Sequence, residues 1–174
     1  MNAVAAAADN PRCAQAWDVL GTVLDPEVPA LSVRDLGIVR DVIAHGEALE
    51  VVLTPTYSGC PATEVIEHDV LAAIDQAGLG PAYVTLQRAP AWTTDWISAD
   101  GRQKLSDYGI APPGPASTDG TVPIRFFGRR VDAIACPRCG SSNTERLSVF
   151  GSTACKAMYR CVSCREPFEH FKPI

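Results

Sequence analysis

Five of the chain's seven cysteines lie in its last forty residues, and four of these form two Cys-x-x-Cys pairs. A Cys-x-x-Cys turn directs two sulfurs at one point, so two such turns can complete a tetrahedral site for a metal ion such as zinc. A module of about 40 residues is too small to fold on a hydrophobic core alone, and metal binding is expected to supply much of its folding free energy. The pattern predicts a zinc-ribbon-like module over 124–174 with one structural zinc ion. Its predicted ligands are Cys136, Cys139, Cys161 and Cys164.

The cysteine pattern leaves some questions about the site open. Four thiolates around iron would give a rubredoxin-like electron carrier, and an iron–sulfur cluster also stays possible on the sequence alone. Cys155, between the pairs, is an alternative ligand, a small buried side chain or a thiol close to the site. Because the pairs give the better chelate, we place Cys155 outside the metal site.

The charge of the chain argues against nucleic acid as the main partner. The formal net charge is −5 and the sequence pI is about 5.1. From Asp132 onward six basic residues stand against four acidic ones, and a zinc ion with four thiolates subtracts two charges. The metal-bound module is therefore near neutral, which weakens any electrostatic grip on phosphates. A structural or protein-binding role is favoured, and self-association stays open.

The chain before the module has the pattern of a small α+β domain. Apolar periodicity and turn residues predict the order α-β-β-α-β-α over 11–110, with helices covering one face of a mixed, two-layer sheet. The segment 111–123 is rich in Pro, Gly and Ser and is expected to be a linker. The fold class predicted is α+β: a two-layer mixed-sheet domain followed by the four-cysteine module.

Cys60 is the candidate functional thiol of the first domain. It stands in LTPTYSGCPATEV, where Pro61 suits the start of a helix and places Cys60 at or near the N-cap. The helix dipole and free N–H groups there favour a thiolate. A buried cap cysteine is the alternative. Asp25 and Glu27 in DPEVP suggest either a carboxylate pair or a turn that ends a helix.

No membrane span is expected, because the chain lacks a run of about 18 apolar residues. The first residues, MNAVAAAADNP, have no basic region like that of a signal peptide. The cytoplasm is therefore the expected compartment, and paired cysteines there are more often metal ligands than disulfides.

Several segments together resemble a known family. LDPEVPALSVRDLGIV and LTPTYSGCPA are similar to the α+β domain of iron–sulfur assembly and maturation factors of the SufT-like kind. AWTTDWIS, ACPRCGS and FGSTACKAMYRC extend the resemblance to the PaaD-type (PaaJ) subunits of phenylacetate-CoA oxygenase, over nearly the whole chain.

The resemblance implies an accessory or maturation subunit of the multicomponent phenylacetyl-CoA 1,2-epoxidase of aerobic phenylacetate catabolism. It implies that the protein assists assembly of metal or iron–sulfur centres and does not catalyse oxygenation. Its partners would be other oxygenase subunits or iron–sulfur assembly proteins. It assigns the functional cysteine to Cys60, as ligand of iron or a transient cluster, and a supporting motif to Asp25, Pro26 and Glu27. The chain has no Glu-x-x-His pair, Gly-rich nucleotide loop or plant-type ferredoxin spacing, in agreement with that role. The alternative is a rubredoxin-like electron-transfer component of the same oxygenase.

Overall fold

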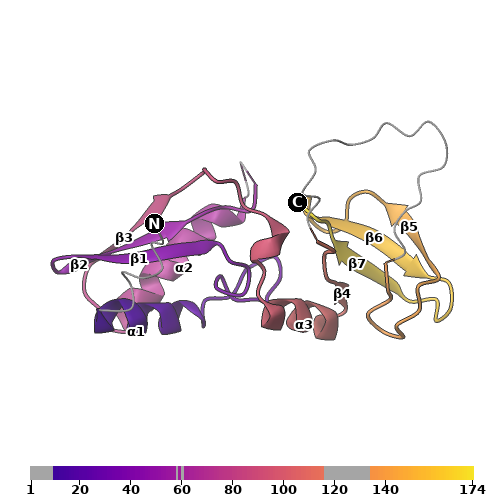
Figure 1. Cartoon of the computed structure of the whole chain (residues 1–174), viewed down its shortest axis with the longest axis horizontal. Helices are drawn as coiled ribbons and strands as arrows, with labels where there is room; N and C mark the ends of the chain where they lie inside the picture. Colours follow the sequence, from indigo (N-terminus) through magenta and orange to yellow (C-terminus); the bar gives the residue numbers. More distant parts are fainter. Residues whose placement is uncertain (1–9, 58, 60, 116–133) are drawn as a thin grey trace. The chain divides into compact units, whose positions relative to one another are not determined.

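The computed structural model divides into two compact units between Gly101 and Arg102, each with its own sheet (Figure 1). The residues that it describes are 10–57, 59, 61–115 and 134–174. In the described residues no helix combines the length and the apolar character needed to cross a bilayer.

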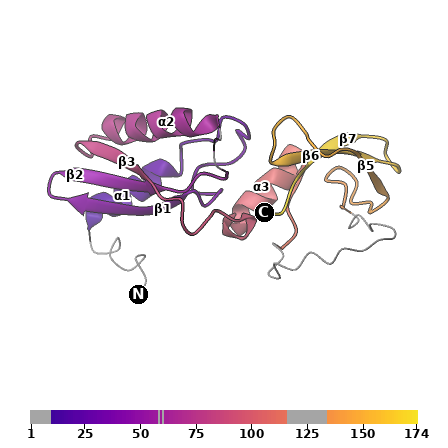
Figure 2. The same cartoon turned by 90° about the horizontal axis from the view of Figure 1, so that it is seen from above.

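The first unit contains a three-stranded mixed sheet in the order β1-β2-β3. The hairpin strands β1 and β2 are antiparallel, and β3 runs parallel to β2 after the crossover through α2. The helices α1 and α2 contact each other, and they contact β1 and β3 respectively, which gives the expected two-layer packing (Figure 2). The elements are α1 (Pro11–Leu20), β1 (Val39–His45), β2 (Ala48–Leu53), α2 (Ala62–Gln76), β3 (Ala82–Leu86) and the 3-10 turn η3 (Thr94–Trp96), and α3 (Ala99–Tyr108) spans the division between the units.

Alternation along β2 explains which face of the first sheet is buried. Leu49, Val51 and Leu53 are almost fully buried, whereas Glu50 between them is only half-buried. Side chains two residues apart share one face of a strand, so the apolar series lies in the core. From the core side of α2, Val70 and Ile74 are fully buried. The predicted apolar helix face over this segment is confirmed.

The second unit contains a four-stranded sheet in the order β4-β7-β6-β5. The strands β5, β6 and β7 form an antiparallel meander, and β4 adds to β7 in parallel. A small core forms around Tyr159 and Phe168, whose rings stack 5.8 Å apart. Cys136 and Cys161 belong to the same core. The strands are β4 (Ile110–Ala111), β5 (Thr144–Ser148), β6 (Lys156–Cys161) and β7 (Pro167–Phe171).

The α+β class with a four-cysteine ribbon is confirmed, while the predicted domain limits stay predictions. Residues 116–133, which include most of the proposed linker 111–123 and the start of the module at 124, lie outside the described residues. The described chain divides earlier, after Gly101. Residues 110–111 lie in the second sheet as β4.

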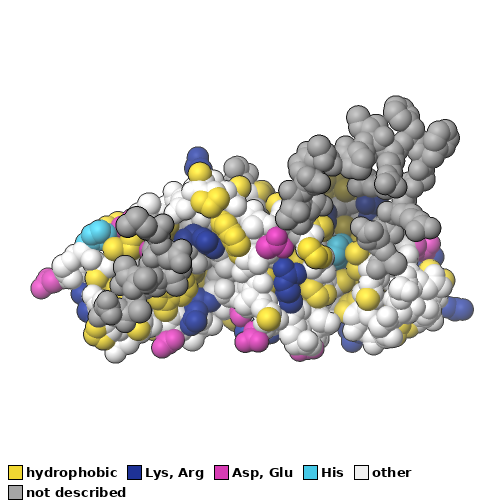
Figure 3. Space-filling view, viewed as in Figure 1, with side chains coloured by type: hydrophobic (Ala, Val, Ile, Leu, Met, Phe, Trp, Pro, Cys, Tyr) yellow, Lys and Arg dark blue, Asp and Glu magenta, His cyan; other side chains and the backbone are white. Residues whose placement is uncertain are grey.

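Hydrophobic side chains also reach the surface. On the face drawn in Figure 3 they lie among charged and polar groups. Scattered exposed apolar residues are normal on a soluble domain, so only a local concentration of them carries information.

Candidate functional site

Two tight turns bring the paired cysteines together at one end of the second sheet. The first turn contains Cys136 and Cys139 and is followed by Gly140, at a φ of 72°. The second begins at Cys161, the last residue of β6, and Cys164 is followed by Arg165, at a φ of 67°. A positive φ is easy for glycine and uncommon for arginine. Both turns thus adopt the same local form, although only one has the glycine that favours it.

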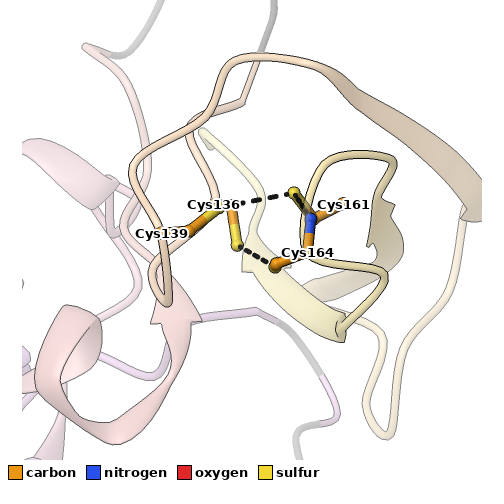
Figure 4. A group of neighbouring side chains, drawn as sticks. All are labelled: Cys136, Cys139, Cys161 and Cys164. Carbon is orange, nitrogen blue, oxygen red and sulfur yellow. Dashed lines mark hydrogen bonds between the residues drawn. The ribbon is translucent and has the colours of Figure 1, made fainter.

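The four sulfurs form a cage of the size that one metal ion requires (Figure 4). All four lie within 4.8 Å of one another, with separations of 3.8 Å for Cys136–Cys164 and 3.6 Å for Cys139–Cys161. A tetrahedral ion with metal–sulfur bonds of about 2.3 Å would place its sulfurs about 3.8 Å apart. The residues present therefore fit a single tetrahedral ion. An iron–sulfur cluster places several iron atoms between its cysteines and needs a wider cage.

The electrostatics of the cage also favour a bound cation. The backbone N–H of Cys164 donates to the Cys161 sulfur at 3.5 Å and, as the largest cause, lowers the pKa of Cys161 to about 6. The Glu166 backbone N–H lowers the pKa of Cys164, but burial and the neighbouring thiols outweigh it and raise that pKa to about 12. One thiolate thus forms readily, while the next is opposed by its neighbour. A divalent ion removes this conflict by stabilising all four thiolates together.

Cys155 lies outside this cage. It is buried just before β6, at the end of the strand opposite to Cys161, and its sulfur lies 3.0 Å from the Thr153 hydroxyl. Its carbonyl accepts from the Lys172 backbone N–H. The structure therefore groups the four paired cysteines without Cys155, in agreement with our placement of it outside the site.

The carboxylate of Asp25 is used within its own turn. It is buried, and its Oδ1 accepts from the backbone N–H groups of Glu27 at 2.9 Å and Val28 at 2.7 Å. Glu27 is half-buried, and Pro26 is exposed. Asp25 thus holds the shape of the loop after α1, which matches the turn interpretation of this motif.

Cys60 itself lies outside the described residues, so its predicted role stays a prediction. The chain around it leaves β2 at Leu53 and enters α2 at Ala62, one residue after the expected start, with Pro61 at the N-cap position. Just before this loop, Thr54 is buried, and its hydroxyl has no hydrogen-bond partner in the described part of the chain.

A buried ion pair in the second unit was not predicted from the sequence. The Nζ of Lys156 lies 3.1 Å from Oε2 of Glu169, and the lysine side chain is only 2% exposed. Lysine is rarely buried, so nothing in the local sequence indicated this. His170 is also buried, and its Nδ1 lies 3.2 Å from the Ala111 carbonyl oxygen. It is a packing residue, as expected for it.

The fold and the cage define the class of protein: an iron–sulfur assembly domain joined to a zinc ribbon. Two family descriptions match, "Iron-sulfur cluster assembly protein" over residues 13–85 and "PaaD zinc beta ribbon domain" over residues 122–172. The chain is 47% identical over 164 residues to the PaaD-like component of the "Putative 1,2-phenylacetyl-CoA epoxidase" of Escherichia coli (strain K12), covering 94% of both chains. The chain belongs to this PaaD-like family of phenylacetyl-CoA epoxidase subunits.

Two further relatives match about half of the chain. The "Fe-S protein maturation auxiliary factor" of Porphyromonas gingivalis is 32% identical over 89 residues, which cover 50% of this chain and 84% of the relative. A crystal structure of a DUF59 domain of unknown function from Bacillus anthracis matches with a TM-score of 0.50 at 25% identity. It covers 53% of this chain and 89% of its own. Both shares correspond to about the length of the α+β unit.

Proposed function

We propose that the chain is an accessory subunit of a phenylacetyl-CoA epoxidase that helps to assemble the metal or iron–sulfur centres of the complex. The observation that carries the proposal is the combination within one chain of an iron–sulfur assembly domain and a PaaD ribbon, together with the similarity over 94% of its length to a PaaD-like epoxidase component. The match to a maturation auxiliary factor supports the assembly role rather than oxygenation.

Within this proposal Cys60 holds the metal or cluster transiently, as a thiolate ligand. Its place in the chain supports this, because it lies in the loop between β2 and α2, directly before the N-terminus of a helix of 15 residues. Such a position stabilises a negative sulfur. Asp25 and its turn are proposed to support the same end of the domain.

The four-cysteine cage is proposed to hold one structural zinc ion and to fold the ribbon. The fit of the sulfurs to a single tetrahedral ion supports zinc, and it also keeps a rubredoxin-like iron site as a second candidate. Zinc would supply no redox chemistry, only folding and rigidity. Metal analysis and the visible spectrum of the purified chain separate the two: one equivalent of zinc and no visible absorption support the structural role, whereas one iron with thiolate charge-transfer bands would establish the electron carrier.

The assembly role is tested by co-expressing the chain with the remaining epoxidase subunits and measuring their iron content and activity. We expect Cys60→Ser to lower both at least several-fold. Cys13→Ala is the matched control, because it removes the other thiol of the first unit at a buried helical position that suits alanine. Normal iron content and activity with Cys60→Ser would contradict the role of Cys60.

A further inference from the structure

The loop between β5 and β6 exposes a local concentration of apolar side chains. Phe150 is 64% exposed, Leu147 54% and Val149 50%. We call these three residues, together with Lys172 beside them, the ribbon tip. They lie at the end of β6 opposite to Cys161, so about 15–20 Å of strand separates them from the metal cage. The cage therefore does not account for them.

The loop that carries Phe150 is held from beneath by the buried ion pair. Glu169 binds the ammonium of Lys156 through Oε2 and accepts from the Ser152 backbone N–H through Oε1. Gly151 passes so close that an added Cβ would lie 2.5 Å from the Glu169 carboxylate. The Gly151 N–H also donates to the Lys156 carbonyl at 2.7 Å. The backbone next to Phe150 is thus fixed, although the side chain itself points into solvent.

Lys172 adds a positive charge next to the exposed ring. Its Nζ lies 4.9 Å from the centre of the Phe150 ring and 3.4 Å from the Val149 carbonyl oxygen. Its backbone N–H donates to the Cys155 carbonyl at 2.9 Å, which ties the end of β7 to the start of β6. An apolar ring and an ammonium group are therefore presented side by side on a rigid support.

The formal charge of the chain is divided unequally between its two units. Residues 1–101 contain four Lys and Arg against fourteen Asp and Glu, a formal charge of −10. Residues 102–174 contain eleven against six, a formal charge of +5. One divalent ion with four thiolates lowers the second value to +3. The unit that carries the ribbon tip thus attracts acidic surfaces, while the overall charge of −5 hides this.

We infer that the ribbon tip is a preformed docking surface for another protein, one with an acidic surface and an apolar pocket that receives Phe150. Rigid aromatic side chains are effective anchors because they bury a large area and lose little conformational entropy. Lys172 selects a carboxylate at the rim of that pocket, and the charge of the unit speeds the encounter. Two aliphatic neighbours and a single cation suit a protein pocket better than a phosphate backbone.

This inference rests on the proposed function, because it takes the partner to be another subunit of the phenylacetyl-CoA epoxidase. The test uses the metal-loaded full chain and the remaining epoxidase subunits of the same organism, purified, in biolayer interferometry. Phe150→Ala is expected to raise Kd at least tenfold. Lys172→Glu is expected to raise Kd to a similar extent, mainly by slowing association at low salt.

Two control variants match these changes away from the tip. Tyr108→Ala removes an aromatic residue of similar exposure, 56%, and Arg88→Glu reverses an exposed charge on the first unit. Both are expected to change Kd less than twofold. Each variant must bind one metal equivalent, which shows that the ribbon is folded.

The outcomes separate the surface from the function. If the wild-type chain binds none of the epoxidase subunits, the proposed function is refuted, and the docking surface with it. If it binds but Phe150→Ala and Lys172→Glu bind equally well, the surface alone is refuted. If Phe150→Ala instead abolishes a concentration-dependent dimer in sedimentation, the occupant is the acidic unit of a second copy, and the assignment to another protein is wrong.

Discussion

Replacing Lys156 by methionine is expected to loosen β6, β7 and the loop between β5 and β6 by about 3 kcal/mol. At the observed separation of 3.1 Å, the two charges attract by about 5 kcal/mol at an effective dielectric constant of 20. The cost of burying the ammonium cancels part of this attraction. What remains in the variant is a carboxylate that has lost its cation, and removing one partner of a buried pair costs about 3–5 kcal/mol. We take the lower end, because the Glu169 side chain keeps 18% exposure and the Ser152 hydrogen bond.

Hydrogen exchange measured by mass spectrometry gives the free energy of opening of these strands directly. A loss of about 3 kcal/mol corresponds to roughly 100-fold faster exchange in peptides from β6 and β7. Lys156→Met combined with Glu169→Gln is the matched control, since the amide oxygen can still accept from Ser152 and no lone charge is left. It is expected to recover at least half of the loss. Unchanged exchange in the single variant would refute the view that the ion pair holds this loop.

Three further predictions concern the metal, the pH and the first unit. Cys161→Ser is expected to lose the bound metal on dialysis and, with it, the exchange protection of the ribbon strands, because metal binding supplies most of a small module's folding free energy; retention of one equivalent would show that the site differs from the cage. Burial lowers the pKa of His170 from its ordinary value of 6.5, so below about pH 6.5 the unfolded chain binds the proton that the folded chain refuses, and the ribbon should lose stability as the pH falls; exchange rates that do not change between pH 7.5 and 5.5, after correction for intrinsic rates, would contradict this. Asp25→Ala leaves two backbone N–H groups of a buried turn without their acceptor and should cost the first unit about 1–3 kcal/mol, measured by denaturant unfolding with tryptophan fluorescence, since all three tryptophans lie in that unit.

The element order of the first unit and the four metal ligands could be predicted because their signals are local. Apolar periodicity indicates helices and strands within about ten residues, and Cys-x-x-Cys indicates a ligand pair within four. The strand β4 has no such signal. It has two residues, and it forms by pairing with β7, which lies far along the chain. A Pro- and Gly-rich composition therefore indicated a linker at a place where tertiary pairing makes a strand.

The burial of Lys156 could not be predicted for a related reason. The residue type argues for exposure, and its partner Glu169 lies on the next strand in a diagonal position that depends on the register of β6 and β7. Asp25 illustrates an intermediate case. Its neighbours predicted a turn, but only the structure shows that its carboxylate is taken up by the backbone of that turn. For Cys60 the local sequence remains the only guide.

The pairing of β4 with β7 has a consequence for the order in which the chain can fold during its synthesis. The paired residues Ala111 and His170 are 59 positions apart. At 5–20 residues per second a ribosome needs roughly 3–12 seconds to add them. During that interval the first unit is complete, while β4 has no strand to pair with and the last two thiol ligands have not been made. The ribbon must therefore capture its metal and close its sheet in one late event, after the first unit is already available to other proteins.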